Sequence, residues 1–81
     1  MTGSNGVSYG YEALKGSGEV WAVRRNVEGV ITGVVGPLDW TERNPRELQW
    51  YEYDNPRWEE DVEWARDMDA DGEWFPYHPT P

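Results

Sequence analysis

The chain contains no cysteine, so it can form neither a disulfide nor a thiolate metal site. It has a single histidine, His78, which lies in a proline-rich tail, and its serines, Ser4, Ser8 and Ser17, all fall in a glycine-rich N-terminal segment. No glycine-rich phosphate loop with an accompanying lysine follows a predicted strand. With so few candidate nucleophiles and bases, we expect a protein that works by binding and is not an enzyme.

Long hydrophobic runs are also absent from the sequence. No stretch approaches the roughly 20 apolar residues that a membrane-spanning helix requires. The first residues lack both the basic and the apolar region of a signal peptide. We therefore expect a soluble, cytoplasmic protein that makes no contact with a membrane.

Basic residues are scarce: 16 acidic residues stand against 7 lysines and arginines, which gives a net charge of −9. The imbalance lies entirely in residues 39–81, which hold 13 acids and 4 arginines, whereas the first 38 residues are neutral. This charge disfavours direct binding to nucleic acids and to anionic membranes. It favours a cationic partner, either a basic protein surface or a metal ion.

Aromatic residues are abundant, with 6 Trp, 5 Tyr and 1 Phe in 81 residues. A domain of this size needs large side chains in its core, but it cannot bury all twelve. We expect Trp40, Trp64 and either Tyr51 or Tyr53 to be partly exposed, where Trp and Tyr are favoured anchors of protein interfaces. The alternative is that these rings only lie at the rim of the core.

Residues 19–35 give the clearest strand signal. Two runs rich in β-branched residues flank a turn at 26–29, in which Gly29 can adopt a positive φ, so a β-hairpin is predicted. Gly33, inside the second run, indicates a bulge or a close approach by another backbone. The alternation over 47–53 predicts a third strand, although Asn44 and Pro45 would also suit the start of a helix.

A helix is predicted over 56–69. Asn55 can cap it and Pro56 suits its first turn. At 100° per residue, Trp58, Val62, Ala65 and Met68 share one face, and acids occupy the opposite face.

These elements predict an α+β fold, a three-stranded, mostly antiparallel sheet with one C-terminal helix packed on it. The alternative is a small SH3-like barrel with an added helix.

Residues 1–18 are predicted to form a flexible arm with at most a short strand near 7–11, residues 19–75 the single domain, and residues 76–81 a proline-rich tail. From residue 72 onward no regular structure is expected, although Trp74 or Phe75 should pack back on the sheet. The expected core comprises Trp21, Val23, Val30 or Ile31, Val34, Leu48, Trp50, Trp58, Val62, Ala65 and Met68.

The acidic helix face is the main candidate site, formed by Glu59, Glu60, Glu63 and Asp67. Together with Trp64 and Trp40 it would dock on a basic surface of a partner protein, as an accessory subunit or an inhibitor. The four acids are spaced at about one charge per 3 Å of helix axis, against about 1.7 Å for duplex DNA, and acids of residues 39–54 could raise this density. An inhibitor that mimics nucleic acid is therefore an alternative. A self-assembling role and a solvated face that only maintains solubility are further alternatives.

The segment 67–72 suggests calcium binding. Asp67, Asp69, Asp71 and Gly72 occupy positions 1, 3, 5 and 6 of an EF-hand loop, and Glu73 would add its backbone carbonyl. The position of the bidentate Glu holds His78 instead, so another acid, such as Glu52 or Glu47, would have to complete the site. No other cofactor is expected.

Overall fold

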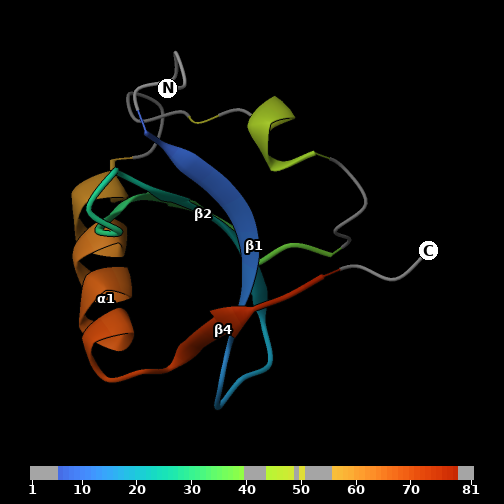
Figure 1. The fold of residues 1–81 in the computed structure, drawn as a ribbon. Helices are drawn as coiled ribbons and strands as arrows, with labels where there is room; N and C mark the ends of the chain where they lie inside the picture. The colour runs from blue at the N-terminus through green and yellow to red at the C-terminus, as the bar shows by residue number, and fades with distance from the viewer. Residues whose placement is uncertain (1–5, 40–43, 49, 51–55, 79–81) are drawn as a thin grey trace.

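The computed structural model describes residues 6–39, 44–48, 50 and 56–78. Within these ranges the four strands form one antiparallel sheet in the order β3-β2-β1-β4, and a helix packs against it (Figure 1). The α+β class is therefore confirmed, but the sheet has four strands and not three. The elements are β1 (Ser8–Leu14), β2 (Val20–Arg25), β3 (Ile31–Val35), the 3-10 turn η1 (Pro45–Glu47), α1 (Trp58–Ala70) and β4 (Trp74–Pro76).

The predicted hairpin is confirmed by β2 and β3. Asn26 Oδ1 accepts hydrogen bonds from the backbone N–H groups of Glu28 and Val30, at 2.9 and 3.0 Å, and Gly29 has φ 84°. Arg24 and Arg25 pair with Gly33 and Ile31, which leaves Thr32 as the extra residue of a β-bulge. The bulge predicted around Gly33 is thus present, and the close approach there comes from the Trp58 side chain.

The N-terminal segment is not a flexible arm over residues 8–14. These residues form β1, which pairs with β2 on one side and with β4 on the other. The prediction failed because β1 contains Gly10 and no β-branched residue, so its strand character depends on pairing with β2 and β4.

The predicted strand at 47–53 begins instead as η1. Asn44 Oδ1 accepts from the backbone N–H of Arg46 at 2.9 Å and Pro45 takes the first position, so the capping signal determines the structure of residues 44–47. The rest of that predicted strand, apart from Leu48 and Trp50, lies outside the described residues. The prediction that no regular structure follows residue 72 was also wrong, since Trp74–Pro76 form β4. Proline is tolerated at position 76 because it lies at the end of an edge strand, where its missing N–H leaves no ladder hydrogen bond unmade.

The core lies between α1 and one face of the sheet, while η1 lies on the other side (Figure 1). Its buried members are Val23, Ile31, Val34, Ala65 and Trp74, so the expected packing of Trp74 is confirmed. Tyr11, Ala13 and Ala22 are buried as well, although no local pattern in the sequence indicates this. Several expected core residues are only half-buried, namely Trp21, Leu48, Trp50, Trp58 and Met68.

Helix α1 starts at Trp58, two residues later than predicted. Its N-cap is Arg57, which makes no side-chain capping bond, and the predicted cap Asn55 lies outside the described residues. The buried stripe consists of Val62 and Ala65, with Met68 packed beside the core. The helix therefore presents most of its remaining surface to solvent.

Candidate functional site

The exposed surface of α1 is strongly acidic. The helix carries six acids and one arginine, and Glu59, Glu60, Glu63 and Asp67 are all exposed, as the sequence predicts. Glu60 pairs with Arg57 at 3.4 Å, but both side chains are about three-quarters exposed (73% and 74%), so this ion pair neutralises little of the surface. The four carboxylates therefore remain available to a cationic partner.

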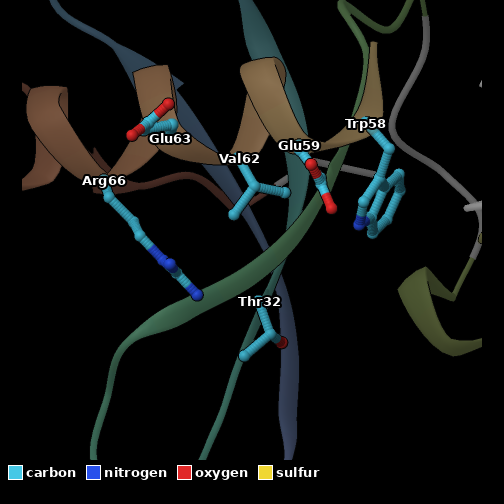
Figure 2. A pocket seen from close by; sticks show the side chains of 6 residues that line it. All are labelled: Thr32, Trp58, Glu59, Val62, Glu63 and Arg66. Carbon is cyan, nitrogen blue, oxygen red and sulfur yellow. The ribbon is translucent and has the colours of Figure 1, made fainter. Parts of the chain in front are cut away.

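Beside this acidic surface, a groove of about 480 Å³ runs between α1 and the edge strand β3 (Figure 2). Val62 lies between the two ends of the groove; Trp58 and Glu59 lie at one end and Arg66 at the other. The complete lining is Thr32, Trp58, Glu59, Val62, Glu63 and Arg66. This groove was not predicted, because nothing in the sequence brings Thr32 next to the helix.

Trp58 is held firmly against the groove. The Arg24 guanidinium lies between two indole rings, 5.6 Å from the centre of Trp58 and 5.3 Å from that of Trp50. On β3, a Cβ atom at Gly33 would lie only 2.9 Å from the Trp58 ring, so glycine makes room for the indole. These contacts give the groove an ordered aromatic wall.

Arginine side chains also occupy backbone acceptors of the edge strand. Arg66 Nε donates to the carbonyl of Ile31 at 2.7 Å, and Arg24 Nη2 donates to the carbonyl of Thr32 at 3.0 Å. Two successive carbonyls of β3 therefore already have donors. The bond from Arg66, at the start of this edge strand, opposes the addition of another strand.

Trp64 belongs to an aromatic cluster and is half-buried. Its ring centre lies 5.3 Å from that of Trp21 and 5.8 Å from that of Trp74. Trp74 in turn donates from Nε1 to the carbonyl of Ala65 at 3.0 Å. Trp64 thus offers a partner only part of its ring, and the other predicted anchor, Trp40, lies outside the described residues, as do Tyr51 and Tyr53.

The structure gives no support to calcium binding at 67–73. Gly72 N–H donates to the carbonyl of Asp69 at 3.0 Å and Glu73 N–H to that of Met68 at 2.9 Å, which is the Schellman pattern of a helix end. Asp67 and Asp69, both inside α1, are two residues apart, so they project about 200° apart around the axis. The carbonyl of Glu73 accepts from the Lys15 N–H. No group of three His, Cys, Asp or Glu suited to a metal occurs among the residues described.

Asp69 serves instead in an ion-pair network around Arg25. The Arg25 guanidinium donates to both carboxylate oxygens of Glu12, at 2.8 and 2.9 Å, and to both of Asp69, at 3.0 and 3.1 Å. It also donates to the carbonyl of Gly29 at 2.8 Å. The hydrogen bonds that Arg25 donates to Glu12 and then to Asp69 raise the pKa of Arg25 further above its usual value, so this group stays charged.

Comparison of the chain with protein families, curated proteins and solved structures finds no match. In the ranges that the structure covers, no helix combines the length and apolar character needed to cross a membrane. The function is therefore inferred from the surface of α1 and the groove beside it.

Proposed function

We propose that the protein binds a basic surface of a partner protein through the acidic face of α1, as an accessory subunit or an inhibitor. The observation that carries this proposal is the exposure of Glu59, Glu60, Glu63 and Asp67 on one helix that has a single arginine. That arginine, Arg66, donates to the backbone carbonyl of Ile31 and offsets one of the six acidic charges of the helix.

Electrostatic complementarity is a physical basis for such binding. A surface of one charge sign accelerates the encounter with an oppositely charged partner and excludes partners of like charge. The exposed rings of Phe75 and Tyr77, which are 42% and 37% exposed, are available as further contacts, although they lie on β4 and beyond it. The acidic helix is therefore assigned the main role.

The test is capture of partners from a lysate of the organism that encodes the chain. The wild-type protein is compared with a variant neutralised on the helix face: Glu59→Gln, Glu60→Gln, Glu63→Gln and Asp67→Asn. The matched control neutralises four exposed acids elsewhere: Glu19→Gln, Glu28→Gln, Asp39→Asn and Asp71→Asn. A partner of the acidic face is retained by the wild type and the control, is lost with the helix variant, and elutes with salt.

The captured protein is then purified and its affinity for the same three proteins is measured directly. Equal binding by the wild type and the helix variant would contradict the proposal. Competition by duplex DNA would show that the partner uses its nucleic-acid site, which is the mechanism of a nucleic-acid mimic. A partner that binds the acidic face without such competition fits an accessory subunit.

A further inference from the structure

We infer that the groove between α1 and β3 binds one lysine or arginine side chain of the partner protein. This inference rests on the proposed function and gives it a specific contact. It assigns the central role to the end of the groove where Glu59 and Trp58 lie, with Val62 beside them (Figure 2). The acids outside the groove, Glu60 and Asp67, contribute only to the negative electrostatic potential of the helix surface.

The charges of the groove suit a cation. Glu59 and Glu63 are four residues apart on α1, so their Cβ atoms lie about 5–6 Å from each other on one side of the helix. In Figure 2 the Glu59 carboxylate lies on the Trp58 side of Val62 and that of Glu63 lies on the Arg66 side, so Glu59 is the direct contact of the cation and Glu63 adds negative charge beside it. Charge-assisted hydrogen bonds of this kind are stronger than those between neutral groups.

The apolar parts of the groove suit the rest of such a side chain. Lysine and arginine carry long methylene stems, which pack well on apolar surface while the charged head remains near water. Val62 and the Trp58 indole line the groove and provide that surface. The indole already has the Arg24 guanidinium 5.6 Å from its ring centre, so the cation of the partner is held by Glu59. A volume of about 480 Å³ lies within the usual range for ligand sites, about 300–1,000 Å³.

Other occupants fit the groove less well. A nucleic acid would bring negative charge to Glu59 and Glu63, and a second copy of the chain would bring its own charge of −9. An added β-strand is opposed by Arg66, which already donates to the carbonyl of Ile31 at the start of the edge strand β3. A single basic side chain does not need this carbonyl.

Glu59 and Arg66 distinguish the two ends of the groove, since an arginine guanidinium also lies near Trp58, that of Arg24. The Arg66 guanidinium lies at the end opposite Trp58 and Glu59 (Figure 2), held by the bond to Ile31. A second cation at that end would be repelled. The partner segment is therefore expected to carry one basic residue at the Trp58 end and a neutral or acidic residue next to Arg66.

The test uses short synthetic peptides in which lysine alternates with glycine, with arginine and Nε-acetyl-lysine versions for comparison. Binding at low salt is followed by NMR through the Trp58 indole N–H and the Val62 methyl groups, with the Trp74 indole as an internal reference. We expect the lysine or the arginine peptide to shift the Trp58 and Val62 signals, and the acetylated peptide to leave them in place. No shift with either basic peptide would overturn the inference.

A pair of double variants then separates the groove from the general acidic surface. Glu59→Gln with Glu63→Gln removes the two groove carboxylates, and Glu60→Gln with Asp67→Asn removes the same charge from the same helix outside the groove. The groove pair is expected to weaken peptide binding about tenfold and the second pair about twofold. Equal weakening by both pairs would overturn the inference that the groove is the binding site, and it would leave the proposed function intact. If capture of a partner fails but the peptides behave as expected, the proposed function is overturned instead.

Discussion

Arg25 connects three elements through one guanidinium group. It extends from β2, bonds to Glu12 on β1 and to Asp69 on α1, and also reaches the turn at Gly29. Its side chain is 20% exposed and that of Glu12 is 16% exposed, so this network is shielded from solvent more than an ordinary surface ion pair. The planar, forked geometry of arginine is required for two bidentate contacts at once.

Replacing Arg25 with lysine is therefore expected to destabilise the protein although the charge is kept. Lysine cannot bond to both carboxylates and the Gly29 carbonyl together, and we expect a loss of about 1–3 kcal/mol in the free energy of unfolding. Urea denaturation measures this change. The control is Arg57→Lys, whose pair with Glu60 is exposed, with an expected change within about 0.5 kcal/mol. Equal effects at the two positions would mean that the Arg25 network contributes no more than a surface pair.

Gly33 is a second residue whose role depends on its close surroundings. A methyl group there would lie 2.9 Å from the Trp58 ring and 3.2 Å from Cζ of Arg24. We expect Gly33→Ala to destabilise the protein by about 1–3 kcal/mol, because the indole must move from its place in the groove. Thermal unfolding and the NMR signal of the Trp58 indole would both report the change.

The matched control for Gly33 is Gly10, which lies inside β1 and where an added methyl group would meet nothing within 4 Å. Gly10→Ala is expected to leave the stability unchanged or to raise it by about 0.4–1 kcal/mol, since alanine restricts the unfolded chain. A similar loss at both glycines would point to strand geometry and not to the Trp58 contact.

At the scale of the elements, β1 is the strand on which the sheet depends. It pairs with β2 from Ser8 to Ala13 and with β4 from Glu12 to Leu14, so it separates the two. Deletion of residues 1–14 is expected to unfold the protein, whereas deletion of residues 1–5 keeps all these pairs and should preserve the fold. Circular dichroism and the dispersion of the NMR spectrum test this. A folded protein after the longer deletion would contradict the topology.

Whether an element could be predicted from the sequence depends on whether local signals or contacts between distant segments determine it. The hairpin and α1 are specified by local signals, namely two β-branched runs around a turn and a helical stripe of apolar residues. Strand β4 has three residues and ends in Pro76, and it exists because β1 supplies its partner. In the same way the acids of the candidate site were predictable from the helix, but the groove was not, since Thr32 reaches it through tertiary packing.

The end of α1 explains why the aspartate-rich segment does not resemble a calcium loop in space. The segment forms the last helical turn and a Schellman ending, and Asp69 is engaged by Arg25. We therefore expect calcium to leave the melting temperature at the value found with sodium chloride of equal ionic strength. A distinctly larger increase with calcium, accompanied by shifts of the Asp71 and Gly72 amide signals, would establish a metal site there.

At the scale of the whole molecule, the distribution of acids along α1 lowers the stability of the helix at some positions. Glu59 and Glu60 lie in the first turn, where the helix dipole favours negative charge. Glu63 and Asp67 do not share this advantage; each has a like charge four residues before it, and Asp67 is near the unfavourable end. Such an arrangement is understandable if these side chains are retained for contact with a partner, because functional surfaces are often kept at some loss of stability.

We therefore predict that Glu63→Gln combined with Asp67→Asn stabilises the protein at low salt. Relief of the like-charge pairs and of the unfavourable dipole contact should contribute about 1 kcal/mol, which corresponds to roughly 4–8 °C in the melting temperature of a domain of this size. The gain should shrink in high salt, where the repulsion is screened. The matched variant, Glu59→Gln with Glu60→Gln, changes the net charge equally but removes favourable dipole contacts, so it should bring no comparable gain. If both variants raised the melting temperature equally, total charge and not the position of the acids would limit stability.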